Sequence, residues 1–163
     1  MNKLNLNIHV HTQKEYEEHE PISLTVRLKN TLKNSIYVVK ETRNLHWDEA
    51  KKTLYVSLAV FNTSTYITFF RVPGMCLVAP GESAEIKTEV HFPFRTFTLE
   101  QHEDDTLSHK FIHINPSDEF SIVTSVGFGF TKFNPESDIH VLQEFMDWQK
   151  TLTSSPVKVI RNF

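Results

Sequence analysis

Histidines are the residues of this 163-residue chain that bear most directly on chemistry, and there are nine of them. Histidine is a common metal ligand and titrates near neutral pH. His9 and His11 lie two residues apart, so in an extended strand their side chains share one face and could reach one ion. His102, His109 and His113 lie close in sequence to the acidic run 103–105. Together with carboxylates, these five histidines could complete a zinc or copper site.

Two other interpretations of the histidines stay open. The chain has no His-Glu-x-x-His or Cys-x-x-Cys motif, and histidines on a polar strand face are also ordinary surface residues. Protonation of several of them between about pH 7 and 5.5 would reverse a net charge of only −3, which is a pH-switch hypothesis.

The motifs of nucleophilic catalysis and of phosphate binding are missing from the sequence. There is no Gly-x-Ser-x-Gly, and Ser121, Ser125 and Cys76 lie in apolar, strand-like contexts. Four glycines leave little material for a Gly-rich phosphate loop. We therefore assign no catalytic and no cofactor-binding residue, and a hydrolase whose site combines distant residues stays as one alternative.

Three phenylalanines are candidates for an interaction surface. Phe92, Phe94 and Phe97 surround Pro93, where a predicted strand passes into a long polar stretch. Aromatic side chains exposed at such a place often anchor a protein partner. The alternative is that they fill the core or cover one end of the fold.

Alternating polar and apolar residues predict most of the elements that would position these side chains. The first strand covers 4–10, and a hairpin is expected where apolar residues flank the charged loop 48–52. Helical spacing after Asp138 favours one short helix over 138–146. Residues 95–108 are expected to be the least structured stretch. The other predicted strands are 22–29, 36–40, 66–72, 83–92, 110–114, 119–130 and 148–160, the last interrupted at 154–156.

The composition favours sheet over helix. Valine, isoleucine and threonine dominate, alanine is scarce, and phenylalanine occurs 13 times. Eight or nine short strands with little helix are typical of an antiparallel sandwich. The prediction is one all-β domain over 1–163, an immunoglobulin-like β-sandwich of about eight to nine strands with one short helix near the C-terminus.

Two segments resemble bacterial immunoglobulin-like and fibronectin-III-like domains. Residues 16–30, YEEHEPISLTVRLKN, are similar to a first-sheet strand of these domains, and LVAPGES at 77–83 is similar to the turn before a middle strand. Residues 153–159 resemble a closing strand. His19 stands where many members have glycine, and the paired cysteines of antibody domains are missing. The resemblance implies an architecture and leaves the function open.

Charge, hydropathy and cysteine content limit the possible partners and the compartment. Seventeen basic and twenty acidic residues are interspersed, which argues against a nucleic-acid partner. No apolar run reaches the length of a membrane span or a signal peptide. A single cysteine and no visible secretion signal favour the cytoplasm.

These observations predict a non-catalytic module that binds a protein partner, or a second copy of itself, through end loops or an exposed edge strand. The alternative, from a different functional class, is a metal- or small-ligand-binding protein that uses its surface histidines.

Overall fold

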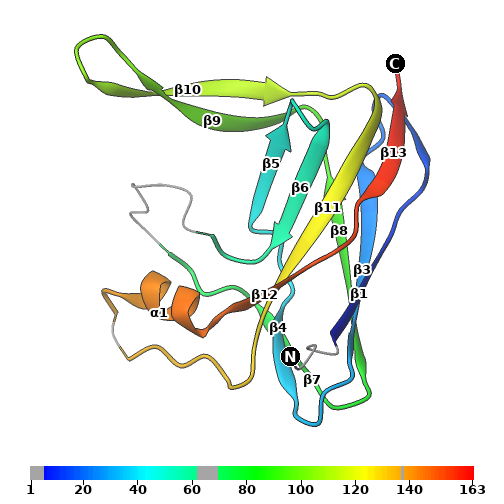
Figure 1. Cartoon of the computed structure of the whole chain (residues 1–163), viewed down its shortest axis with the longest axis vertical. Helices are drawn as coiled ribbons and strands as arrows, with labels where there is room; N and C mark the ends of the chain where they lie inside the picture. Colours follow the sequence, from blue (N-terminus) through cyan, green and yellow to red (C-terminus); the bar gives the residue numbers. More distant parts are fainter. Residues whose placement is uncertain (1–5, 62–69, 137) are drawn as a thin grey trace.

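A computed structural model describes residues 6–61, 70–136 and 138–163, and these form strands in three sheets with one short helix (Figure 1). The chain is mostly β. The strands are β1 (Leu6–His11), β2 (Glu15–Glu17), β3 (Ile22–Asn30), β4 (Ile36–Val39), β5 (Asn44–Asp48), β6 (Thr53–Leu58), β7 (Met75–Val78), β8 (Ser83–Val90), β9 (Phe94–Gln101), β10 (Leu107–Ile114), β11 (Asp118–Gly129), β12 (Lys150–Thr153) and β13 (Val157–Asn162). The helix, α1, spans Val141–Trp148.

The smaller of the two packed sheets has the order β1-β3-β8 and is antiparallel throughout. Its strands alternate strictly: Ile22, Leu24 and Val26 are buried, whereas Ser23 and Arg27 are exposed. This is the pattern of a sheet with one face in the core and the other in water.

The larger sheet is organised around β11. On one side β11 pairs with β13 and then β12, and on the other with β6 and then β4. On their far edges, β13 pairs with β2, β4 pairs with β7, and β6 pairs with β5. The pairs β6–β11 and β2–β13 are parallel. One hydrophobic core with residues from both sheets holds them together.

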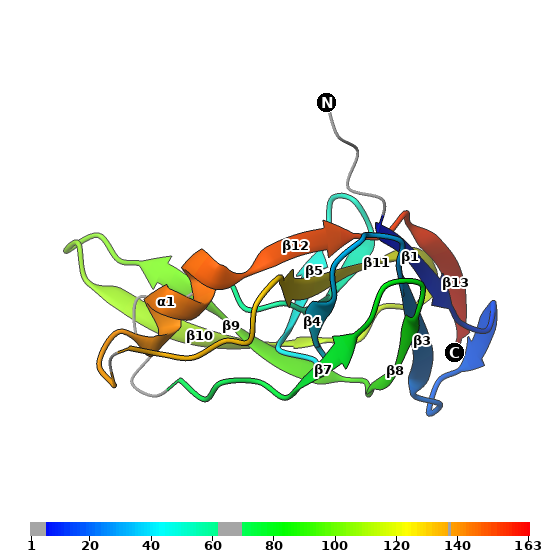
Figure 2. The same ribbon diagram turned by 90° about the horizontal axis from the view of Figure 1, so that it is seen from below.

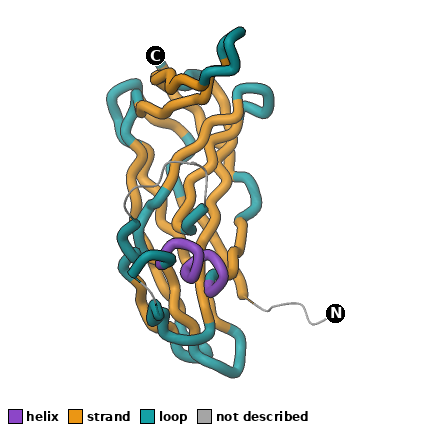
Figure 3. The backbone as a smooth tube through the Cα atoms, turned by 90° about the vertical axis from the view of Figure 1, so that its left-hand side faces the viewer, coloured by secondary structure: helices purple, strands orange, loops and turns teal. Residues whose placement is uncertain are grey.

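A second, smaller hydrophobic cluster lies beneath α1. It is built from Val39, Val60, Phe133 and Phe145, and the rings of Phe133 and Phe145 meet edge-on at 4.8 Å. Figures 2 and 3 show α1 on the outside of the strands, continuing directly into β12. The helix therefore covers its own patch of core.

Glycines let the end of α1 approach β11 closely. A Cβ on Gly129 would lie 2.2 Å from the Trp148 ring, and one on Gly127 would lie 2.4 Å from the Gln149 side chain. Gln149 accepts a hydrogen bond from the Val60 N–H at 2.8 Å and donates one to the Val60 carbonyl at 2.9 Å. Its amide therefore pairs with Val60 much as a neighbouring strand would.

The two segments that carry the immunoglobulin-like resemblance meet at Asn30. Its buried side-chain amide donates to the carbonyls of Asn34 and Val78, both at 2.9 Å, and its Oδ1 accepts from the Leu32 N–H. The Gly81 N–H, in a residue with φ +82°, donates to the Asn30 carbonyl. The two turns are thus fastened to each other.

The sheets are not closed, and the predicted arrangement needs correction. A clean immunoglobulin-like sandwich is not seen: the described residues form more than nine strands, two of the pairings are parallel, and one hairpin makes a sheet of its own. The stretch 95–108, expected to be the least structured, is instead mostly strand: β9 and β10 pair over eight residues each, and only residues 102–106 between them form a turn. Strands β2 and β7 were not predicted.

The other predicted elements fare better. The hairpin around 48–52 is confirmed as β5–β6, and the interrupted final strand as β12 and β13. The helix is confirmed with shifted bounds: His140, not Asp138, is its N-cap residue, and no side chain caps it. The predicted strand 66–72 falls mainly on 62–69, outside the described residues, and its described part is not strand.

Candidate functional site

The hairpin of β9 and β10 is the part of the structure that stands apart from both packed sheets (Figure 1). Within the described part of the chain, neither strand pairs with a third one. An isolated two-stranded ribbon is only marginally stable in water, because one of its faces is not covered. The hairpin is therefore the first place to look for a partner.

Two large apolar side chains on β10 are left in solvent. Leu107 is 58% exposed and Phe111 is 59% exposed, and they share one face because they lie four residues apart on a strand. The Arg95 guanidinium lies over the Phe111 ring at 4.6 Å. The backbone register places Phe97 opposite Phe111, although the side chains of Phe97 and His109 lie outside the described part of the structure.

The loop of the hairpin is acidic and well ordered by hydrogen bonds. Glu103, Asp104 and Asp105 are all exposed there. Hydrogen bonds from the Thr106 hydroxyl and backbone N–H lower the pKa of Asp104. The Asp105 N–H donates to the His102 carbonyl, and Asp105 itself has φ +61°. The hairpin therefore presents a negative end and an apolar face.

Phe92 and Phe94, predicted as interaction residues, are only half-exposed and pack against the main core. The Phe92 ring contacts Phe94 and Phe120, at centroid distances of 5.8 and 6.4 Å. They anchor the base of the hairpin. Sequence reasoning missed Leu107 and Phe111. The signal that could have found them is of the kind that indicated the β5–β6 hairpin, namely apolar residues on both sides of a polar, charged run, here 102–106.

The structure places the candidate histidines in two separate groups. His9 and His11 are exposed on β1, and His102 and His113 are exposed on the hairpin, which belongs to another sheet. Across the described ranges, no three histidine, cysteine, aspartate or glutamate side chains gather as a metal site would require. The metal hypothesis stays a prediction.

One contact bears on the hydrolase alternative. The His102 Nε2 lies 2.6 Å from the Ser108 hydroxyl, a distance at which a histidine can act as a general base. Among the described contacts, no carboxylate orients the His102 ring, and the pair lies exposed on the hairpin. Elsewhere, burial raises the pKa of the half-buried Cys76 thiol, which makes it a poorer nucleophile at neutral pH.

Arg161 is the most unusual buried residue. It is only 1% exposed, and it donates to the Asn115 side chain at 2.8 Å and to the carbonyls of Pro116 at 2.7 Å and Glu18 at 2.6 Å. Its guanidinium lies over the Phe92 ring at 4.2 Å. Desolvation lowers its pKa, an effect that the Glu18 carboxylate opposes. Arg161 ties β13 to the loop between β10 and β11, at the base of the hairpin.

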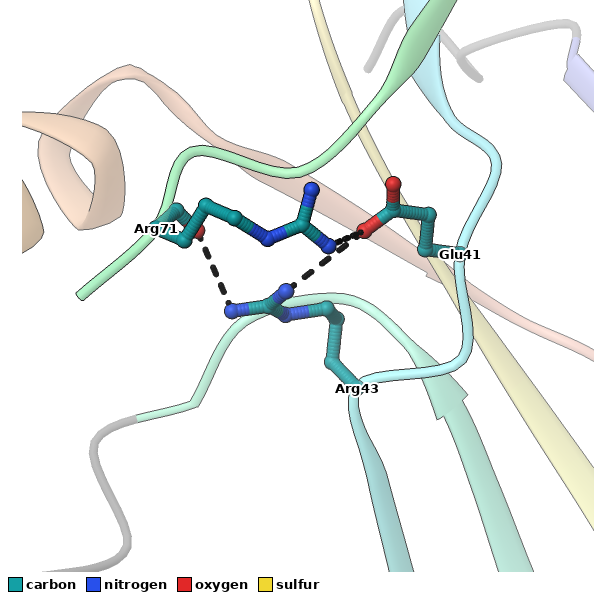
Figure 4. A network of polar contacts seen from close by, with 3 residues as sticks. All are labelled: Glu41, Arg43 and Arg71. Atoms are coloured by element: carbon teal, nitrogen blue, oxygen red, sulfur yellow. Dashed lines mark hydrogen bonds and ion pairs between the residues drawn. The ribbon is translucent and has the colours of Figure 1, made fainter.

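A second polar network involves Glu41, Arg43 and Arg71 (Figure 4). One oxygen of Glu41 lies 2.9 Å from the Arg71 guanidinium and 3.5 Å from that of Arg43, which also donates to the Arg71 carbonyl at 3.2 Å. Each of the three residues therefore contacts the other two. The network braces the segment before β7 against the connection between β4 and β5.

Comparisons with known proteins assign the chain to no family: no protein-family model matches it, and no curated protein matches it. No helix in the described residues is long and apolar enough to cross a membrane.

Proposed function

We propose that this protein is a non-catalytic binding module that engages a protein partner through the β9–β10 hairpin. The observation that carries the proposal is the pair Leu107 and Phe111, more than half exposed on a ribbon that no third described strand covers. Exposed apolar and aromatic side chains of this kind are the usual anchors of protein interfaces.

The packing at the base of the hairpin supports this role. Phe92 and Phe94 fix the start of β9 against the core, and Arg161 holds the end of the connection that follows β10. An anchored hairpin loses little conformational freedom on binding, which favours affinity. The immunoglobulin-like relationship indicated by residues 16–30 and 77–83, and the cytoplasmic location, are further parts of this proposal.

The test compares two variants that remove equally exposed apolar side chains. The immobilised wild-type chain is incubated with an extract of its own cells, and so are Phe111→Ser and Leu77→Ser. Leu77, on β7, is 57% exposed and serves as the matched control. We expect bound protein, further copies of the chain included, to be lost with Phe111→Ser and retained with Leu77→Ser. No bound protein, or equal binding by both variants, would contradict the proposal.

A further inference from the structure

The backbone of β10 has a row of hydrogen-bonding groups that point away from β9. In antiparallel pairs, hydrogen-bonded and non-hydrogen-bonded residue pairs alternate. The His102 N–H donates to the Thr106 carbonyl, so this pair is hydrogen-bonded, and counting along the register makes 101–107, 99–109, 97–111 and 95–113 the non-hydrogen-bonded pairs. The N–H and C=O groups of residues 107, 109, 111 and 113 therefore face outward.

This edge is accessible. Strand β10 runs along the outer side of the hairpin in Figure 1, away from β5. The exposed side chains Leu107 and Phe111 belong to two of the residues whose backbone groups face outward. An edge strand with free backbone groups and apolar side chains is a template for pairing with another strand.

Resting on the function proposed above, we propose that the partner is a second copy of this chain, paired antiparallel along the β10 edges about a two-fold axis at residue 109. Outward-facing residues then meet outward-facing residues: Leu107 lies opposite Phe111 of the second copy, and Phe111 lies opposite its Leu107. The two ribbons form one four-stranded sheet, and the two-fold arrangement makes the contact self-complementary.

The distribution of charge favours this occupant over an unrelated strand. The loop end of the hairpin carries Glu103, Asp104 and Asp105, whereas the base carries Arg95 opposite His113. Antiparallel pairing brings the acidic end of each copy to the basic base of the other, with Asp105 opposite His113. A parallel arrangement would instead place the two acidic ends together, which is unfavourable.

Sedimentation equilibrium tests the pairing, from about 10 μM to about 500 μM because an interface of one strand is small and therefore weak. The decisive variant is His109→Pro, which removes an N–H that faces outward and leaves the hydrogen bonds between β9 and β10 intact. Leu99→Pro is the matched control, since it removes the corresponding N–H from the opposite edge. We expect a dimer for the wild type and for Leu99→Pro, and a monomer for His109→Pro.

Three further variants test the pairing without a proline in the hairpin. Phe111→Ser should weaken the dimer at least ten-fold. Asp105→Lys should weaken it about ten-fold, because the two-fold arrangement loses two exposed ion pairs of about three-fold each, and Arg95→Glu in the same chain should restore it. A wild type that stays monomeric, a dimer insensitive to Phe111→Ser, or equal effects of the two prolines would overturn the pairing. Capture of another protein that depends on Phe111 would still leave the proposed function standing.

Discussion

At the scale of single residues, the fold depends on a few side chains that no local pattern marks. Arg161 is buried, and no carboxylate among the described residues contacts it directly; carbonyl and amide oxygens from three residues share its charge. The sequence shows only one arginine near the end of an alternating strand. Its role becomes visible once β13 lies between β2 and β11.

Replacing Arg161 should be among the most damaging single changes. Arg161→Ala would leave the Pro116 and Glu18 carbonyls without their donor and open a cavity beside Phe92, so we expect a loss of about 3–5 kcal/mol in the free energy of unfolding. Urea denaturation followed by circular dichroism measures this. Arg27→Ala, which removes an exposed arginine paired with Glu85, is the control and should cost less than about 1 kcal/mol. Similar losses in both variants would contradict the assignment.

Gly129 gives a second prediction at this scale. Gly129→Ala would push a Cβ into the Trp148 ring, so we expect a loss of about 1–3 kcal/mol from overpacking. Gly74→Ala is the matched control, because its Cβ would meet the side-chain ends of Glu41 and Lys40, and shifting Glu41 should cost no more than its partly exposed ion pairs, about 1 kcal/mol or less. Thermal unfolding of both variants, followed through tryptophan fluorescence, makes the comparison. If Gly129→Ala is as stable as the wild type, Trp148 does not pack on β11 as described.

At the scale of elements, the alternation of polar and apolar residues predicted two kinds of strand: those that pair with a strand close in sequence, and those with one face buried and the other in solvent. Strands β3 and β8 and the β5–β6 hairpin are of this kind. The three residues of β2 form a strand only through parallel pairing with β13, more than a hundred residues later, and no local signal reports that. The hairpin of β9 and β10 was mistaken for a loop because polar and charged residues interrupt its apolar positions.

The turn of the β5–β6 hairpin predicts how stability depends on pH. A hydrogen bond from Lys52, and then one from the Trp47 indole, lower the pKa of Glu49, and the Lys51 backbone N–H lowers that of Asp48. Carboxylates with a depressed folded-state pKa stabilise the fold above their unfolded-state pKa and lose this contribution as pH falls through the folded-state value.

We therefore expect the free energy of unfolding to fall as pH drops below about 4.5. Glu49→Gln should make this fall smaller. Urea titrations at several pH values measure the effect, and because the Glu49 carboxylate is exposed, added salt should reduce the difference between variant and wild type. A variant whose pH dependence matches that of the wild type at low salt would contradict the prediction.

At the scale of the whole molecule, the composition and the strand spacing correctly indicated a mostly β chain with one C-terminal helix. The turn motifs at residues 30 and 79–82 correctly marked places where the chain reverses. What could not be predicted was the order of the strands, because β11 pairs with four others and two of its neighbours come from the last fourteen residues. The exposed pair Leu107 and Phe111 was missed for the same reason as the hairpin that carries it, because polar and charged residues interrupt the apolar positions there.

This organisation predicts that two truncations have opposite effects. Replacing the hairpin residues 97–111 by a short Gly-Ser turn removes a ribbon that no third described strand covers, so the body should still fold cooperatively. Removing residues 157–163 deletes β13 and Arg161, which separates β2 from β11, so no cooperative unfolding transition should remain. Calorimetry of both chains distinguishes these outcomes, and a C-terminal truncation that still unfolds cooperatively would contradict the central role of β13.

The parallel pairing of β2 with β13 also has a consequence for synthesis on the ribosome. The chain leaves the ribosome from its N-terminus, and domains fold as their residues emerge. Strand β2 cannot pair with its neighbour until residues 160–162 have been made. The hydrogen bond from Arg161 to the Glu18 carbonyl is likewise missing until then. Until then, the outer edge of β11 that β13 covers is open to other strands. Nascent chains of this protein should therefore depend on chaperones until β13 has been made and has left the ribosome.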